Sequence, residues 1–137
     1  MNISDIWVET NERYEFVSIT GELKRVVRES GVSEGICIVS STHTTAAVTV
    51  NEDYDRDVPR DLAVACRTLV GGLDVRFEHA EGNSDSHFLT SLFGQSQHLL
   101  VRDGAPDLGR WQGVFLAEFD GPRRRTVRVA VYPAERP

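Results

Sequence analysis

Cysteine is scarce in this sequence, and long apolar runs are absent. The 137 residues include two cysteines, Cys37 and Cys66, and two thiols in a chain with no sign of secretion are usually reduced core residues. No stretch approaches the roughly 18 consecutive apolar residues of a membrane span, and the N-terminus lacks a basic start followed by an apolar run. We therefore predict neither a span nor a signal peptide, and we expect a cytoplasmic protein.

Positive charge is in deficit. Lys and Arg number 15 against 21 Asp and Glu, which gives a formal charge of −6 at pH 7. Binding to nucleic acid relies on cationic side chains that displace counterions from phosphates, so we expect no nucleic-acid partner, and any bound phosphate must be contacted locally. The 40% hydrophobic and 26% charged residues are typical of a globular chain, and the length predicts a single domain over residues 1–137.

The apolar pattern predicts strands alternating with helices. Helices are expected at 20–30, from about 59 to 70, and from Asn83 or Ser84 to Gly94. Strands are expected around 3–8, 16–19, 35–41, 44–50, 73–77, 99–102, 111–119 and 126–132. The first two are predicted to form a hairpin, and the apolar run at 35–41 is typical of a strand buried on both faces. Together these elements predict an α+β fold with helices packed on one side of a largely antiparallel sheet.

Three histidines lie near the predicted ends of separate elements: His43, His79 and His87. Three neutral imidazoles with an open water position form a usual catalytic zinc shell, and imidazole also suits other transition metals. The spacing of His79 and His87 lacks the i, i+4 facing of a helical zinc pair, so hydrogen-bonded structural histidines remain the alternative. His98 shares a predicted strand face with Leu100, and we interpret it as structural or exposed.

Other polar groups could contact a phosphorylated ligand. The helix after Asn83 offers free backbone N–H groups, although simple capping explains the same residues. Arg123 and Arg125 belong to a basic cluster whose guanidinium forks could bind a diphosphate, with surface ion pairs as the alternative. Trp111 offers an aromatic face for a heteroaromatic ring, although a strand tryptophan is more often part of a core. Glu52 is a candidate acid, base or metal ligand.

Five motifs in order carry a resemblance over nearly the whole chain. They are SSTHTTAAVTVNE at 40–52, HAEGNSDSH at 79–87, GQS at 94–96, LGRWQ at 108–112 and EFDGPRRR at 118–125. Together they resemble the YjbQ family, which is associated with secondary thiamine-phosphate synthase activity. The resemblance implies a homotrimer with a histidine-lined site near the subunit boundary. It also implies a transferase that joins hydroxymethylpyrimidine diphosphate to a thiazole phosphate and releases diphosphate.

The resemblance assigns provisional roles to the matching positions. A divalent metal, zinc or another transition metal, is expected at His43, His79 and His87, and magnesium could accompany the diphosphate. Catalytic carboxylates are expected at Glu52, Glu118 and Asp120, and substrate contacts at Asn51, Asn83, Trp111, Gln112, Arg123 and Arg125. Two alternatives stay open: a metal-dependent hydrolase of a phosphate ester, with Glu52 or Glu118 moving the proton, and a trimeric metal- or small-ligand-binding module without catalysis.

Overall fold

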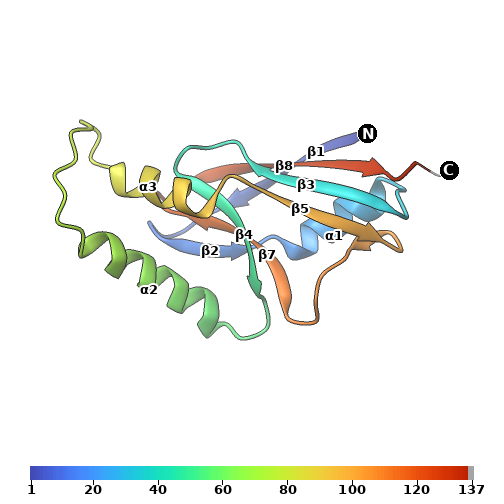
Figure 1. Ribbon diagram of the computed structural model, residues 1–137, viewed down its shortest axis with the longest axis horizontal. Coiled ribbons are helices and arrows are strands. Elements are labelled where there is room, and N and C mark those ends of the chain that lie inside the picture. The colour runs from blue at the N-terminus through green and yellow to red at the C-terminus, as the bar shows by residue number, and fades with distance from the viewer. Residues whose placement is uncertain (136–137) are drawn as a thin grey trace.

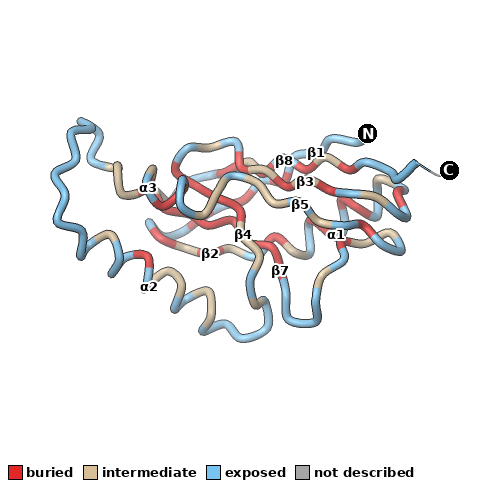
Figure 2. Tube along the Cα trace, viewed as in Figure 1, coloured by how far each residue is buried: buried red, intermediate tan, exposed pale blue. Residues whose placement is uncertain are grey.

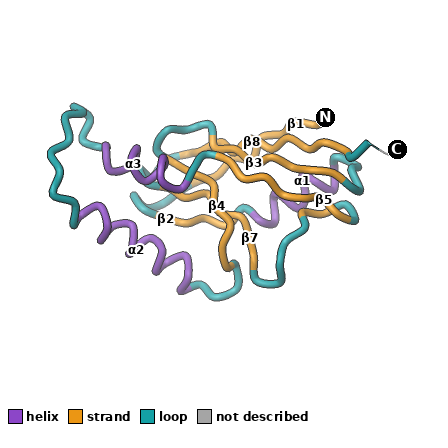
Figure 3. Tube along the Cα trace, viewed as in Figure 1, coloured by secondary structure: helices purple, strands orange, loops and turns teal. Residues whose placement is uncertain are grey.

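The computed structural model describes residues 1–135 and confirms the α+β class (Figures 1 and 3). Its elements are β1 (Asn2–Glu9), β2 (Glu15–Ser18), α1 (Thr20–Glu29), β3 (Gly35–Ser41), β4 (Ala46–Glu52), α2 (Asp57–Gly71), α3 (Ser84–Phe93), β5 (Ser96–Arg102), β6 (Ala105–Pro106), β7 (Gln112–Glu118) and β8 (Arg124–Pro133). None of the helices in residues 1–135 is both long enough and apolar enough to cross a membrane.

The strands form two sheets, in which each pairing is antiparallel. One sheet has the order β1-β8-β3-β5-β6 and the other the order β2-β7-β4. The predicted hairpin between the first two strands is therefore wrong, because β1 and β2 belong to different sheets. The side chains explain the separation: Ile6 of β1 is buried in one hydrophobic cluster, and Phe16 of β2 in another.

The three-stranded sheet lies between these two hydrophobic clusters. Along β7, Val114 and Leu116 belong to the cluster that includes α1, while Phe115 and Ala117 belong to the cluster beneath α2 and α3. The strand buried on both faces is thus β7, and the same prediction for 35–41 is wrong. On β3 one face is buried and the other is partly or fully exposed, because no layer formed by residues 1–135 covers the second face.

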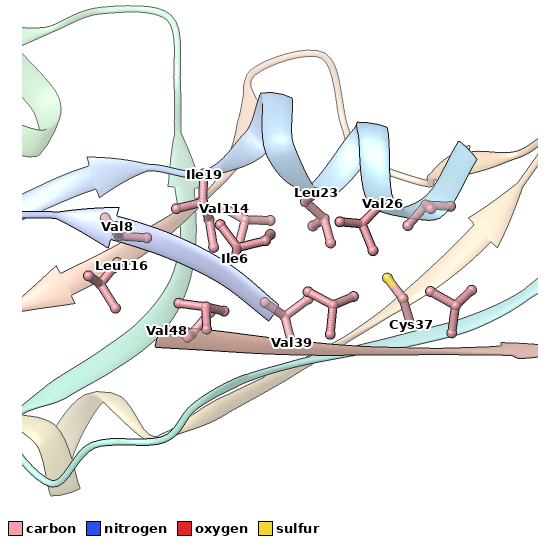
Figure 4. Packing of buried hydrophobic residues seen from close by; sticks show 14 of the residues in the cluster. Ile6, Val8, Ile19, Leu23, Val26, Cys37, Val39, Val48, Val114 and Leu116 are labelled. Atoms are coloured by element: carbon pink, nitrogen blue, oxygen red, sulfur yellow. The ribbon is translucent and has the colours of Figure 1, made fainter. Parts of the chain in front are cut away.

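Helix α1 forms as its sequence predicts. Leu23, Val26 and Val27 follow one another at helical spacing and pack against both sheets (Figure 4). Thr20 is the first helical residue. Its Oγ1 donates to Asp53 at 2.7 Å and accepts the Val114 N–H at 3.0 Å. Thr20 therefore joins the start of α1 to the three-stranded sheet.

A long exposed loop connects α2 to α3. Residues 71–82 are all exposed, and the strand predicted at 73–77 does not form. The alternation of Leu73, Val75 and Phe77 suits a strand, but a strand also needs a pairing partner, and residues 1–135 offer none to this segment. Helix α3 ends before Gly94, whose φ of 88° favours glycine, as predicted.

Candidate functional site

A cleft of about 490 Å³ lies where the start of β4 approaches α3. We call it the histidine cleft, and its lining residues are His43, Thr44, His87, Thr90, Ser91, Gly94 and Gln95. Small-molecule sites commonly have volumes of about 300–1,000 Å³. Two of the three predicted histidines therefore line one cavity of suitable size.

Helix α3 places its polar residues by helical periodicity. His87, Thr90 and Ser91 are spaced i, i+3 and i+4, so they share one helix face, and all three line the cleft. The ring of His79, at the end of the exposed loop, meets His87 edge-on with 5.4 Å between centroids. All three histidines named from the sequence are thus gathered at one end of the molecule.

The hydrogen bonding of His43 fixes its chemical state. Its Nε2 accepts the backbone N–H of Thr126 at 2.8 Å, so the neutral ring carries its proton on Nδ1. Burial lowers the pKa of His43, and the charges of Arg125 and Arg123 lower it further against the opposing charge of Glu118. His43 is therefore neutral at pH 7, and its Nδ1–H is the group left to donate to a ligand.

In this arrangement the three histidines do not form a ready metal shell. Among residues 1–135, no three His, Cys, Asp or Glu side chains are placed to hold one metal ion. A histidine ligand must also offer a nitrogen lone pair, whereas the Nε2 lone pair of His43 accepts from Thr126 and Nδ1 carries the proton. The same protonation state of His43 suits an anionic ligand, because an N–H donor beside two arginines favours negative charge.

Acidification is expected to destabilise the protein through His43. Its pKa in the folded chain lies below the ordinary value of 6.5, so the unfolded chain binds the proton more readily. The stability due to the neutral ring is complete above pH 6.5 and is lost as pH falls through the folded pKa. Thermal unfolding at about pH 8 and about pH 5 measures the loss. His43→Gln, which does not titrate in this range, should show a smaller loss, and an equal loss would contradict the assignment.

Thr90 of the histidine cleft carries a buried hydroxyl without a partner among the described residues. Its side chain is buried, with 8% exposure, and its Oγ1 has no hydrogen-bond partner in residues 1–135. Buried polar atoms nearly always have a partner, so the hydroxyl of this cleft-lining residue is an exception. The sequence analysis did not select Thr90 or Ser91, although their helical spacing from His87 could have identified them.

Glu118 and Arg125 form a buried ion pair beside the cleft. Glu118 is 0% exposed and Arg125 is 2% exposed, and Nε of Arg125 donates to Glu118 at 2.9 Å. Thr10 also donates to Glu118 at 2.7 Å, and Arg125 donates to the hydroxyl of Thr45 at 2.9 Å. These contacts engage both oxygens of Glu118 and the Nε and Nη2 atoms of Arg125. The ion pair is a structural and electrostatic feature of the fold, and the catalytic role expected of Glu118 and the substrate contact expected of Arg125 stay predictions.

Asp120, Asn83 and Arg123 form a second polar group at the start of α3. The Asp120 carboxylate accepts from Asn83 at 2.9 Å and from Arg123 at 3.0 Å. The Oδ1 atom of Asn83 is buried without a partner among the described residues. The structure thus brings these three predicted residues together, and they link α3 to the turn between β7 and β8.

The remaining four predicted residues lie at the opposite end of β4 and β7 (Figure 1). In the ladder of these strands Ala46 is opposite Glu118, whereas Glu52 is opposite Gln112. Six residues along a strand span about 20 Å. The group comprises Asn51, Glu52, Trp111 and Gln112. One chain therefore does not bring these residues into its own histidine cleft.

An exposed aromatic pair marks this far end, which we call the aromatic tip. Tyr54 and Trp111 meet edge-on with 4.9 Å between ring centroids, and the guanidinium of Arg110 lies 4.9 Å from the Trp111 ring. The Gln112 side chain accepts the Gly109 N–H at 2.8 Å. Trp111 is 47% exposed, so part of its surface remains free for a further contact.

Comparison with known proteins identifies the family of this chain. The family model described as UPF0047 protein YjbQ-like matches residues 4–134. The chain belongs to the YjbQ family. UPF0047 protein MJ1081 of Methanocaldococcus jannaschii is 44% identical over 124 residues, which cover 90% of this chain and 89% of that protein. UPF0047 protein YugU of Bacillus subtilis is 36% identical, with coverages of 90% and 94%.

Solved structures of the YjbQ family have the same fold. A crystal structure from Clostridium acetobutylicum, described as an uncharacterized conserved protein of the family, is 40% identical with a TM-score of 0.89, over 94% of this chain and 99% of that one. Hypothetical protein APE1520 of Aeropyrum pernix is 29% identical with a TM-score of 0.90, over 98% and 100%. These names specify no reaction, so the activity has to be inferred from the site.

Proposed function

We propose that this YjbQ-family protein is a transferase that binds a diphosphate ester in the histidine cleft. The reaction would join hydroxymethylpyrimidine diphosphate to a thiazole phosphate and give thiamine phosphate and diphosphate. The observation that carries the proposal is the state of His43, a neutral imidazole whose Nε2 is engaged and whose Nδ1–H can donate to an anion. Thr90 and Ser91, two residues with hydroxyl side chains, line the same cleft.

The proposed transfer step needs the kind of N–H and O–H donors that the histidine cleft offers. The bond between the pyrimidine methylene carbon and the diphosphate oxygen breaks as the bond to the thiazole nitrogen forms, and the electron pair of the broken bond leaves on the diphosphate. Donors placed around the leaving oxygens stabilise the charge that develops there. His43, Thr90 and Ser91 supply N–H and O–H groups, and the nearby arginines favour an anion. Magnesium would enter with the diphosphate.

In the proposed reaction, the aromatic tip of one chain contacts the substrate in the cleft of a second copy. Trp111 and Gln112 lie about 20 Å from the cleft of their own chain, from the strand spacing, and we propose that they contact the pyrimidine in a neighbouring subunit. Asn51 and Glu52 would accompany them. We further propose a cytoplasmic homotrimer, and the metal expected at the three histidines stays a prediction to be tested by elemental analysis.

Replacing His87 with alanine is expected to reduce thiamine-phosphate formation by about 10²-fold. The assay supplies both substrates with magnesium and measures thiamine phosphate and released diphosphate. His98→Ala is the matched control, because His98 is an exposed histidine on β5 that does not line the cleft. It should retain the activity of the unchanged protein.

Three results would contradict parts of this proposal. Equal losses in the two variants would show that the effect is not specific to the cleft. Release of phosphate from the pyrimidine diphosphate without the thiazole partner would indicate a hydrolase. Binding of inorganic diphosphate without turnover of either substrate would indicate a binding module. Metal analysis of the untagged protein, with His87→Ala beside it, tests the histidine metal site separately.

A further inference from the structure

The first turn of α3 is held in place by its own side chains. The helix carries three of the residues that line the histidine cleft, but residues 71–82, which lead into it, are all exposed (Figure 2). The chain that enters the helix is therefore solvated rather than packed. Asn83, at the N-cap, donates its side-chain amide to Asp120 at 2.9 Å. The direction in which α3 presents its residues thus depends on side-chain contacts to other elements.

Asp85 in this turn is bound by two consecutive residues of the connection between β1 and β2. Nη2 of Arg13 lies 3.0 Å from each carboxylate oxygen of Asp85 and donates to both. The hydroxyl of Tyr14 donates to Oδ2 of the same carboxylate. Hydrogen bonds with an ionised partner are shorter and about twice as strong as those between neutral groups. We call Arg13, Tyr14 and Asp85 together the α3 clamp.

The tyrosine is the rigid part of the α3 clamp. Tyr14 is 5% exposed, and its ring meets Phe119 edge-on with 6.2 Å between centroids. The Asp85 side chain is 17% exposed, whereas that of Arg13 is 45% exposed. An exposed ion pair contributes little, because water screens it and the long side chain loses freedom. We therefore expect the bond from the buried tyrosine to fix α3 more firmly than the bond from Arg13.

A second contact prevents the helix from turning. The hydroxyl of Ser86, which is 0% exposed, donates to the Phe119 carbonyl oxygen at 2.6 Å. Consecutive side chains of an α-helix point about 100° apart, at about 3.6 residues per turn. Contacts at Asp85 and Ser86 therefore hold the first turn from two directions, one toward the connection between β1 and β2 and the other toward the turn after β7. Rotation of α3 about its axis would break one of them.

We infer that Arg13, Tyr14 and Asp85 are positioning residues for the histidine cleft. The inference rests on the proposed function, which places the leaving diphosphate in that cleft. Within residues 1–135 the cleft lining includes none of the three, so they act through His87, which follows Asp85 by two positions on the same helix. The His87 ring also meets His79, but His79 belongs to the exposed loop, so the α3 clamp provides the firmer support.

Removing the Tyr14 hydroxyl tests the inference, since Tyr14→Phe keeps the packed ring. A rotated α3 presents its cleft residues in the wrong direction, and a shift of about 1 Å can cost about 10²-fold in rate. We expect kcat for thiamine-phosphate formation to fall about tenfold with little change in KM, because the misaligned donors act on charge that develops in the transition state. Tyr132→Phe is the matched control. It removes a hydroxyl from β8, away from the residues that line the cleft, and should leave both constants unchanged.

A double-mutant cycle separates the α3 clamp from a general loss of stability. Asp85→Ala should also lower kcat about tenfold, and adding Tyr14→Phe to it should lower kcat no further, because either change breaks the same bond. Asp5→Ala breaks a comparable pair, in which Arg128 donates to the two carboxylate oxygens at 2.9 and 3.2 Å, and it should retain full activity. Losses that multiply in the double variant, or full activity of Tyr14→Phe, would overturn the positioning role.

Amide hydrogen exchange monitors the α3 clamp without any substrate. Amides of α3 should exchange at least about tenfold faster in Tyr14→Phe and in Asp85→Ala than in the unchanged protein, while those of α1 should exchange at the same rate. Unchanged exchange in α3 would overturn the clamp. An unchanged protein that forms no thiamine phosphate would refute the proposed reaction instead, and the exchange rates would still decide whether these residues hold the helix.

Discussion

Replacing Arg125 with methionine is expected to lower the free energy of unfolding by about 3–5 kcal/mol. The change leaves the carboxylate of Glu118, which is 0% exposed, without its cationic partner. A buried charge that loses its partner destabilises a fold strongly, because desolvation of that charge is no longer offset by the ion pair. Urea unfolding followed by circular dichroism measures the loss.

Two further variants separate this cause from a general effect of losing an arginine. Arg124→Met removes an exposed partner of Glu9, and exposed pairs contribute little, so stability should change little. Arg125→Met combined with Glu118→Leu removes both charges and should recover part of the loss. If the double variant is no more stable than Arg125→Met alone, the unpaired carboxylate is not the cause.

Replacing His43 with glutamine is expected to reduce thiamine-phosphate formation by about 10²–10³-fold while largely preserving stability. A glutamine amide oxygen can occupy the place of Nε2 and accept the Thr126 N–H, but it supplies no donor in the place of Nδ1. Asparagine is the complementary change, because its amide nitrogen can replace the Nδ1 donor while the acceptor for Thr126 is lost.

The two amide variants should therefore separate the two roles of the ring. His43→Asn should unfold at lower denaturant concentration and keep more of its activity than His43→Gln. Steady-state kinetics and urea unfolding of both variants provide the measurement. If both variants lose activity equally and also lose a bound metal, His43 is a metal ligand and the anion-donor role is wrong. If both keep full activity, the cleft is not the site of the reaction.

The sequence predicted those elements whose signal is local. Helix α1 and the valines of β8 follow from periodicity alone, since Leu23 and Val27 repeat at helical spacing and Val127, Val129 and Val131 at strand spacing. Pairing depends on residues far apart in the chain. For that reason the predicted hairpin of the first two strands and the predicted strand at 73–77 were both wrong. Alternation identifies a strand's faces and not its neighbours.

The same difference between local and long-range signals decides which parts of the candidate site could be predicted. The motifs selected His43, His79 and His87, and the fold brings them to one end of the molecule. The sequence does not reveal that Glu118 is buried, because the burial of a charged residue depends on which layers cover it. It also does not reveal that Trp111 lies at the far end of β7, since that position depends on the direction in which β4 and β7 run together.

Because β7 is buried on both faces, the protein is expected to unfold in stages. Because the three-stranded sheet divides the interior, the α2 and α3 layer rests on the cluster around Phe115 and Phe119, while α1 and the five-stranded sheet enclose the other cluster. Cooperative opening units commonly follow such divisions. Mild denaturant should therefore release the helical layer first, abolishing the cleft while the sheets still protect their amides. For this chain, loss of ligand binding would precede loss of the fold.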